Sequence, residues 1–417
     1  MKNLNLLKIL AIILLLATFS SCSKDDNDSS NIPEPQPDSL NTNLDSLSFT
    51  VSEATDWTLL FKRNSGWFGG DGIFSIPFNG VDSIGAGQNT KTLIFFSDTN
   101  IGEIKNGVLM PGFKIINNSA AIIEGNDPDE EKINFYWDKD AEDKPKALFI
   151  PTTPESQEGD YYWLGDGFVN HEKGNATYVM AYKIKKVNTA FGFAIGGSSI
   201  IVIPEGSQPP FSDHRQIDAP LFVDGDKIDN GYAFGAGIFV NTEKAGAPNP
   251  DGYVYVYGVK NGTAPFEKNL MVSRVLPQDF EDFSKWRFWD GSDWSIDINN
   301  IKNAATITNR VSDELSVTPL SDGRYALVFQ DYGIGKSVAL RLSLSPVGPF
   351  GPVIKLFDCP EPAMDLDYFT YNAKAHPNLS KSGELLFSYN VNSFNFFSDI
   401  QLQPNLYRPR FIKIKFN

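Results

Sequence analysis

The stretch Asp322-Gly-Arg-Tyr-Ala-Leu-Val-Phe-Gln-Asp331 shows the pattern that decides the fold. A turn-forming Asp-Gly pair is followed almost at once by an apolar and aromatic run, which a polar Gln-Asp pair ends. The stretch Ser382-Gly-Glu-Leu-Leu-Phe-Ser388 repeats the pattern, and similar runs occupy residues 92–96, 178–182, 199–203 and 253–257. These runs predict short β-strands joined by tight turns. Outside them, only residues 278–285 predict a short helix.

The predicted strands form five blocks of roughly seventy residues each, which is a weak internal repeat. The blocks cover residues 58–103 with a partner strand after 108, then 146–204, 217–276, 312–357 and 371–417. Such a repeat favours a β-propeller, because radial sheets leave few exposed edges. The last strand, 410–416, is expected to close the ring by pairing with a strand near 46–51. We therefore predict an all-β fold, a single five-bladed β-propeller over residues 48–417. Two β-sandwich domains are the alternative, which the absence of a linker after Leu47 disfavours.

The composition excludes several classes of function. The chain has 417 residues, with 36 Lys and Arg against 51 Asp and Glu, so its formal charge is −15. A nucleic-acid partner is therefore not expected, because it would need a basic surface. Two cysteines exclude a zinc site built on several cysteines. The sequence contains no Gly-x-Ser-x-Gly elbow, phosphate loop or dinucleotide fingerprint.

The N-terminus reads as an export signal. Lys2 and Lys8 precede a short apolar run over residues 9–16 and a group of small residues, which predicts a signal peptide over 1–21. The sequence Ala-Thr-Phe-Ser-Ser-Cys that ends at Cys22 resembles a bacterial lipobox, with Phe19 where the motif usually has Leu. We therefore predict that Cys22 is lipidated. A plain signal peptide with an incidental cysteine is the alternative.

Residues 22–47 are rich in Asp, Asn, Ser and Pro, so they predict a disordered, acidic tether. Its beginning, Ser23-Lys-Asp-Asp26, resembles the export signal that sends lipoproteins of Bacteroidetes-type bacteria to the outer face of the outer membrane. The expected location is thus the outer membrane, through a lipid anchor that faces the cell exterior. An ordinary acidic tether is the alternative. With Cys22 lipidated, Cys359 remains alone and no disulfide is expected.

Two motifs combine aromatic residues, glycines and an aspartate. They are Ser65-Gly-Trp67-Phe-Gly-Gly-Asp71-Gly72 and Tyr161-Tyr-Trp163-Leu-Gly-Asp166-Gly167. Glycines allow the backbone to approach a ligand closely, tryptophan can stack on a sugar ring, and aspartate can address its hydroxyls or anomeric carbon. A third aspartate, Asp98, ends the strand at 92–96. Glycine-rich turns and a strand-terminating Asx turn are the structural alternatives.

The fourth and fifth blocks add further polar candidates. Glu314 opens the fourth block as a candidate general acid, and Asp331 ends its central strand. His376 opens the fifth block, and Asn390 lies at the end of the following strand. A solvated glutamate and a buried core histidine are the alternatives. The three scattered histidines predict no multi-histidine metal site, and no cofactor is required; a structural calcium held by oxygen ligands stays open.

These motifs together resemble two families of secreted propellers. The segments 66–72, 96–99, 235–239, 253–258 and 314–317, with Ala375-His-Pro377 and Ser388-Tyr-Asn390, are similar to domain of unknown function 4185. The resemblance is closer to a related family of lipoproteins, domain of unknown function 5005. Some relatives in the first family are endo-D-arabinanases, and the wider superfamily includes five-bladed arabinanases and related glycosidases.

The resemblance implies a funnel at the propeller axis and a glycoside hydrolase of arabinanase-like type. Hydrolysis of a glycoside needs two carboxyl groups across the scissile bond. We expect Asp71 as base or nucleophile, Glu314 as acid, and Asp98 or Asp166 as the tuning carboxylate. The remaining candidates, expected to contact substrate, are Trp67, Trp163, His376, Asn390 and Asp331. A monomer that binds a poly- or oligosaccharide is expected. The alternatives are a non-catalytic glycan-binding lipoprotein and a surface scaffold.

Overall fold

The structure is a computed structural model that describes residues 41–417, except 189–191, 226–230 and 263–265. Strands hold 47% of the described residues and helices 11%. The α-helices in the described part are the short α1 (Thr55–Leu60) and α2 (Phe396–Leu402). Among the described residues, no helix is long and apolar enough to cross a membrane. The all-β prediction is confirmed. The predicted signal peptide and most of the predicted tether lie outside the described residues.

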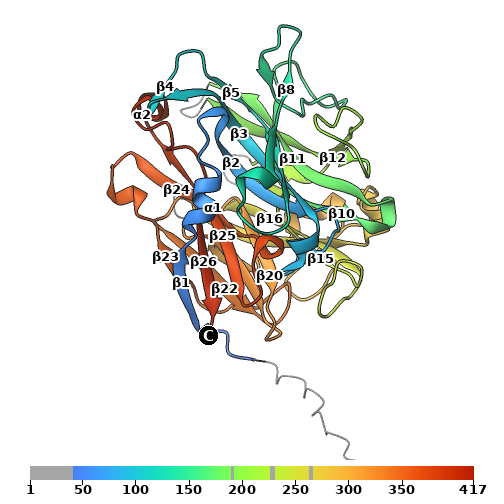
Figure 1. The fold of residues 1–417 in the computed structure, drawn as a ribbon. Helices are drawn as coiled ribbons and strands as arrows, with labels where there is room; N and C mark the ends of the chain where they lie inside the picture. Colours follow the sequence, from blue (N-terminus) through green and yellow to red (C-terminus); the bar gives the residue numbers. More distant parts are fainter. Residues whose placement is uncertain (1–40, 189–191, 226–230, 263–265) are drawn as a thin grey trace, which may run out of the picture. The chain divides into compact units, whose positions relative to one another are not determined.

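Five antiparallel sheets form the blades of a β-propeller (Figure 1). Blade one contains β2 (Ser65–Pro77), β3 (Lys91–Lys105), β6 (Ser119–Glu124) and β7 (Ile133–Tyr136), with β4 (Val108–Leu109) and β5 (Lys114–Ile116) also paired to β3. Blade two contains β10 (Tyr161–Asn170), β11 (Ala176–Lys186), β12 (Phe193–Ile203) and β13 (Arg215–Ala219). Between these blades, β8 (Asp138–Lys139) pairs with β9 (Pro145–Lys146).

The other three blades follow in chain order. Blade three contains β14 (Phe222–Val223), β15 (Tyr232–Asn241), β16 (Tyr253–Asn261), β17 (Lys268–Val275), β18 (Arg287–Phe288) and β19 (Thr308–Val311). Blade four contains β20 (Leu315–Pro319), β21 (Tyr325–Gln330), β22 (Ser337–Ser343) and β23 (Ile354–Asp358). Blade five contains β24 (Tyr368–Ala375), β25 (Glu384–Ser393), β26 (Arg410–Phe416) and, from the other end of the chain, β1 (Phe49–Glu53).

The expected ring closure is present in blade five. Strand β1 pairs antiparallel with β26, so that Phe49 faces Phe416 and Glu53 faces Ile412. The first and last strands of the propeller therefore share one sheet, which ties the chain ends together and confirms the closing pair that the sequence predicts.

The helix predicted over residues 278–285 is wrong. Two separate 3₁₀ turns, η4 (Pro277–Asp279) and η5 (Phe283–Lys285), occupy this segment. Asp282 caps the second turn, because its side chain accepts a hydrogen bond of 3.1 Å from the backbone N–H of Ser284. This local capping bond starts a new turn in place of a continuous helix. The other 3₁₀ turns in the described residues are η1 (Ala86–Asn89), η2 (Glu130–Lys132), η3 (His171–Lys173), η6 (Ile298–Asn303), η7 (Glu361–Ala363) and η8 (Pro377–Leu379).

The hydrophobic core consists of five clusters, each shared between neighbouring blades. In β21 of blade four, Val328 packs in the cluster shared with blade five, whereas the adjacent Phe329 packs in the cluster shared with blade three. In β11, Tyr178 likewise packs in the cluster shared with blade three, and the adjacent Val179 packs in the cluster shared with blade one. Successive side chains of a strand point to opposite faces, and here both faces are covered by other blades. This explains the uninterrupted apolar runs in the sequence.

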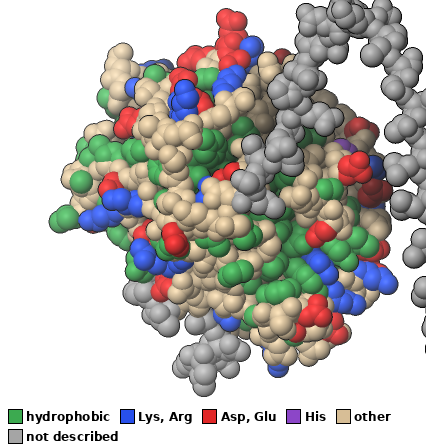
Figure 2. Space-filling view, turned by 90° about the horizontal axis from the view of Figure 1, so that it is seen from below, with side chains coloured by type: hydrophobic (Ala, Val, Ile, Leu, Met, Phe, Trp, Pro, Cys, Tyr) green, Lys and Arg blue, Asp and Glu red, His purple; other side chains and the backbone are tan. Residues whose placement is uncertain are grey.

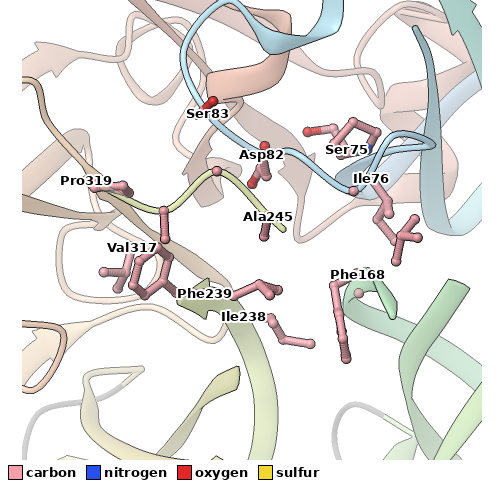
Figure 3. Close-up of a pocket in the computed structure, with 17 residues that line it drawn as sticks. Ser75, Ile76, Asp82, Ser83, Phe168, Ile238, Phe239, Ala245, Val317 and Pro319 are labelled. Carbon is pink, nitrogen blue, oxygen red and sulfur yellow. The ribbon is translucent and has the colours of Figure 1, made fainter. Parts of the chain in front are cut away.

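The innermost strands β2, β10, β15, β20 and β24 surround the propeller axis. The C-terminal ends of β2, β10, β15 and β20 line a small pocket of about 40 Å³, which the loop bearing Asp82 and Ser83 crosses (Figure 3). Ile76, Phe168 and Ile238 are among the side chains that line it. A volume of this size has room for about three water molecules. Ser75, Asp82 and Ser83 line the pocket as well, and burial together with the charge of Asp166 raises the pKa of Asp82 to about 7. This end of the axis therefore carries polar as well as apolar groups.

The described residues 41–47, which fall at the end of the predicted tether, contact blade four. The Arg324 guanidinium donates to the backbone oxygens of Asn43 (2.6 Å) and Ser46 (2.9 Å), and the side chain of Leu44 packs against the core cluster between blades four and five. The tether boundaries at 22 and 47 stay a prediction. On the face that Figure 2 shows, acidic and basic side chains are interspersed with apolar groups, so no large patch of one sign gathers there.

Candidate active site

Backbone irregularities in the innermost strands place polar side chains at the axis. The pairing register shifts between Gly70 and Gly72 in β2, between Leu164 and Gly167 in β10, and between Tyr371 and Lys374 in β24. An extra residue in a strand breaks the strict alternation of faces and can redirect a side chain. Asp71 and Asp166 both lie within such shifts. The glycines of the two sequence motifs therefore permit the bulges that present the aspartates.

Asp71 is held by blade five. The Tyr371 hydroxyl donates a hydrogen bond of 2.8 Å to Asp71 Oδ2. The other oxygen, Oδ1, is buried and accepts no hydrogen bond of ordinary geometry from the described residues. Burial raises the pKa of Asp71, against the effect of the Tyr407 and Tyr371 hydroxyls and the positive charge of Lys374. Tyr371 thus fixes one oxygen in position, and the other oxygen is enclosed by the protein.

Asp98 joins blade one to blade two. Its Oδ1 accepts hydrogen bonds from Trp163 Nε1 (3.0 Å) and Asn117 Nδ2 (3.1 Å). Burial and the neighbouring charge of Asp71 raise the pKa of Asp98 to about 7, although these two donors lower it. The mutual influence of the two carboxyl groups shows that Asp71 and Asp98 belong to one electrostatic cluster.

Asp166 lies on the innermost strand of blade two and is held by the backbone. Its Oδ2 accepts a bond of 2.7 Å from the Ile238 N–H of blade three, and its Oδ1 accepts one of 2.8 Å from the Gly167 N–H. Burial raises the pKa of Asp166 to about 7, against these two bonds and the charge of Lys374. This carboxyl group thus connects two innermost strands as well as belonging to the cluster.

Glu314 precedes the innermost strand of blade four and is held by two residues of β24. Lys374 Nζ lies 2.5 Å from Glu314 Oε2, and Asn372 Nδ2 donates to Oε1 over 2.9 Å. The Lys374 side chain is only 2% exposed and that of Glu314 is 13% exposed. Burial raises the pKa of Glu314 to about 8, with Lys374 opposing the rise and Asp71 adding to it.

Lys374 connects the carboxyl groups of different blades. Besides Glu314, its ammonium group donates to the backbone oxygens of Gly72 and Asn372 and lies 4.4 Å from the Phe74 ring centroid. Two consecutive hydrogen bonds therefore link Glu314 to Gly72, which places the Glu314 carboxyl within about 6 Å of that backbone oxygen. Since Gly72 follows Asp71 directly, the acidic residues of blades one and four lie in the same region. The structure thus brings together Asp71, Asp98, Asp166 and Glu314.

Trp163 is the predicted aromatic residue that the structure places in this region. Its indole N–H binds Asp98, and its ring lies 4.7 Å from that of Phe193. The side chain is half-buried, so part of its ring can meet a ligand. The sequence motif around Trp163 and Asp166 therefore supplies both a carboxyl group and an aromatic surface.

Trp67 and His376 are instead buried in the structure. Trp67 is 1% exposed and packs among Phe61, Phe96 and Phe135, because the register shift after it turns its ring into the core. His376 is 1% exposed, with hydrogen bonds to Ser75 Oγ (2.9 Å) and Ser388 Oγ (2.7 Å). Burial and the charge of Lys374 lower the pKa of His376 to about 3, so its ring is neutral. Neither ring is presented to a ligand, so the geometry does not support the predicted contacts of Trp67 and His376 with substrate.

Asn390 and Asp331 are likewise engaged by the protein. Asn390 is 1% exposed and its Nδ2 donates to the Gly70 backbone oxygen over 3.3 Å, which supports the strand that carries Asp71. Both oxygens of Asp331 accept bonds of 2.7 Å from the Arg310 guanidinium. Their predicted contact with substrate therefore gains no support from the geometry.

Several polar residues of the cluster were not predicted. Lys374, Asn372, Tyr371 and Tyr407 contact the carboxyl groups, and three of them lie in the segment 371–377, which contains the predicted His376. The available signal was a lysine between two alanines, Ala373 and Ala375, near the end of strand β24. In the described part of the chain, no three His, Cys, Asp or Glu side chains are grouped to hold a metal ion. The structural calcium that the sequence left open thus gains no support from the described residues.

Comparison with known proteins gives the same fold. A putative hydrolase from Bacteroides ovatus ATCC 8483 is 18% identical, with a TM-score of 0.64 over 93% of this chain and 97% of that one. An α-L-arabinofuranosidase from Clostridium thermocellum ATCC 27405 is 11% identical, with a TM-score of 0.41 over 81% of this chain and 87% of that one. At 18% identity the first likeness shows the fold alone. No curated protein matches the sequence. The family profile described as domain of unknown function (DUF5005) matches residues 54–416, and the chain belongs to that family.

Proposed function

We propose that the protein is a glycoside hydrolase that acts on oligo- or polysaccharides at the propeller axis. The observation that carries this proposal is the convergence of Asp71, Asp98, Asp166 and Glu314 from three blades, each with a raised pKa. Glycoside hydrolysis needs one carboxyl group that keeps a proton and another that has lost it at the same pH. A cluster that titrates over a range near neutrality can supply both.

Glu314 has the features of the general acid. With a pKa of about 8, it keeps its proton at neutral pH and can donate it to the glycosidic oxygen. The carboxylate that forms would then be stabilised by the ammonium group of Lys374 at 2.5 Å. Lys374 is a positioning residue in this scheme, because it acts through Glu314.

Asp71 has the features of the base or nucleophile. Tyr371 fixes one of its oxygens, and the buried Oδ1 faces no protein donor of ordinary geometry among the described residues. Burial raises the pKa of Asp71, whereas the Tyr407 and Tyr371 hydroxyls and the charge of Lys374 oppose this rise and favour the ionised form. Asp98 and Asp166 would tune the cluster, because ionisation of one carboxyl group raises the pKa of its neighbours.

We further propose that this site faces the outside of the cell. The support is the lipobox-like sequence before Cys22 and the acidic residues after it. The lipid chain on Cys22 would anchor a monomeric enzyme to the outer membrane, with residues 23–40 as part of its tether. Polysaccharides outside the cell are then the available substrates.

Release of reducing sugars tests the proposed activity. The purified protein is incubated with linear arabinan, arabinoxylan and galactan, beside the variants Asp71→Asn and Glu314→Gln. We expect each variant to lose activity by a factor of 10² or more, within the range of about 10² to 10⁴ typical of acid–base catalysis. The matched control is Glu124→Gln, which removes an exposed carboxylate that pairs with Lys91 on blade one, and it should keep full activity.

Two results would contradict the proposal. If Asp71→Asn hydrolyses the substrate as fast as the unmodified protein, Asp71 has no part in the reaction. If the unmodified protein binds one of these polysaccharides and releases no sugar, a non-catalytic glycan-binding protein replaces the hydrolase.

A further inference from the structure

A series of aromatic rings leads from the carboxyl cluster to the outer surface of blade five. Tyr371, whose hydroxyl binds Asp71, lies 5.5 Å from Phe369 between ring centroids. Phe369 in turn lies 4.7 Å from Phe394. Phe394 is 57% exposed, whereas Phe369 and Tyr371 are half-buried. Aromatic side chains thus extend without a break from Asp71 to solvent.

The exposed end of this series is held by the backbone. Phe394 follows β25 directly, and its N–H donates to the Asp367 backbone oxygen over 3.0 Å. The neighbouring Asn395 Nδ2 donates to the Asp367 carboxylate over 2.5 Å. Because these bonds join the segment before β24 to the segment after β25, the position of the exposed ring does not depend on burying it in the core.

A second aromatic group lies on the other side of blade one. Asp98 is bound by Trp163 of blade two, and the Trp163 ring contacts that of Phe193. Blade one lies between blades five and two, because its innermost strand neighbours those of both. The carboxyl pair Asp71 and Asp98 is therefore flanked by aromatic rings from two different blades.

We propose that Phe369 and Phe394 form a sugar-binding subsite, and that a polysaccharide chain runs from this subsite across blade one to Trp163. The inference rests on the proposed function, which it extends from a reaction centre to the path of the substrate. Sugar rings have apolar faces that pack on aromatic rings, and their hydroxyls bind carboxylates and amides such as those of Asp367 and Asn395. The proposed subsite is continuous with the carboxyl cluster, and this continuity favours a glycan over a protein as the bound partner.

Binding to a polysaccharide in an inactive background tests the subsite. Asp71→Asn is run in native gels that contain linear arabinan, arabinoxylan or galactan, and the retardation gives a dissociation constant for each. Adding Phe394→Ala should weaken binding about tenfold, the effect of losing one aromatic stacking contact. Phe394 is exposed, so the fold should survive, and an unchanged thermal unfolding midpoint verifies this.

Phe397→Ala is the matched control. Phe397 is a 71%-exposed phenylalanine of the same blade on helix α2, and its ring contact is with Phe396. The proposal expects no change in binding for this variant. Equal losses from both substitutions would overturn the subsite, because they would indicate a general apolar surface.

The remaining outcomes separate the two proposals. If Asp71→Asn is retarded and Phe394→Ala changes nothing, the subsite is overturned while the proposed function stands. If neither the unmodified protein nor Asp71→Asn is retarded by any of the three polysaccharides, and none of them is hydrolysed, both proposals are overturned for these glycans.

Discussion

Replacing Asp98 by asparagine isolates the energetic cost of one carboxyl group in the cluster. Both hydrogen bonds to Asp98 end on Oδ1, from Asn117 and Trp163. An asparagine whose oxygen takes that place keeps both bonds, and its NH₂ group takes the place of Oδ2. The substitution Asp98→Asn therefore removes the ability to ionise and leaves both hydrogen bonds of the side chain intact.

The expected effect on stability depends on pH. Folding raises the pKa of Asp98 from 3.8 to about 7. Below pH 4 the group is protonated in both states and costs nothing. Between pH 4 and pH 7 the unfolded chain loses the proton while the folded protein keeps it, so the free energy of unfolding falls as the pH rises. At 1.36 kcal/mol per pKa unit the full cost is about 4 kcal/mol, and coupling to Asp71 and partial exposure reduce it to about 2–4 kcal/mol.

Urea unfolding of both proteins at pH 4, 6 and 8 measures this difference. We expect Asp98→Asn to match the unmodified protein at pH 4 and to be more stable by about 2–4 kcal/mol at pH 8. The control is Asp127→Asn, which removes an exposed partner of Lys381 and should show no such gain. A stability difference that is the same at all three pH values, or a less stable variant at pH 8, would refute the reasoning.

Three further predictions each concern the substitution of a single residue. Lys374→Met should lower the free energy of unfolding by about 2–3 kcal/mol in the same urea assay, because the buried backbone oxygens of Gly72 and Asn372 lose the Lys374 donor, and an unchanged stability would contradict this reasoning. Gly69→Ala should destabilise the protein by about 3 kcal/mol, because the new Cβ would lie 1.9 Å from the Tyr407 backbone oxygen. Thermal unfolding measures this change. A variant as stable as the unmodified protein would be incompatible with the close approach. Cys22→Ser should abolish incorporation of labelled palmitate into the protein in a bacterial host, whereas continued labelling would rule out Cys22 as the acceptor.

The fold could be predicted because strand and turn signals are local. Runs such as 325–329 are apolar at every position, which indicates a strand covered on both faces, and Val328 and Phe329 do serve two different inter-blade cores. The closing pair of strands was also predictable, because an N-terminal and a C-terminal strand were left without partners. The helix at 278–285 was wrong because a short polar stretch does not reveal that a capping aspartate will divide it into two turns.

The candidate site was only partly predictable, because the sequence does not show where a strand bulges. Asp71 and Trp67 are neighbours in one motif, yet register shifts between them send the carboxyl group to the axis and the indole to the core. Lys374 was missed for a related reason. A lysine in a strand usually faces solvent, and its burial against Glu314 arises only when blades four and five are placed side by side.

The pairing of β1 with β26 has a consequence for how this protein is made. The contact between Phe49 and Phe416 closes a loop that contains nearly all of the described chain, so it has the largest loop-closure entropy to overcome. The closing sheet cannot form until the last residues have been synthesised, and contacts of such high sequence separation slow folding. Until then β1 and β25, which flank β26 in the finished sheet, lack this partner and present open edges. Loss of β26 by C-terminal truncation would leave these two edges permanently open and is therefore expected to promote aggregation.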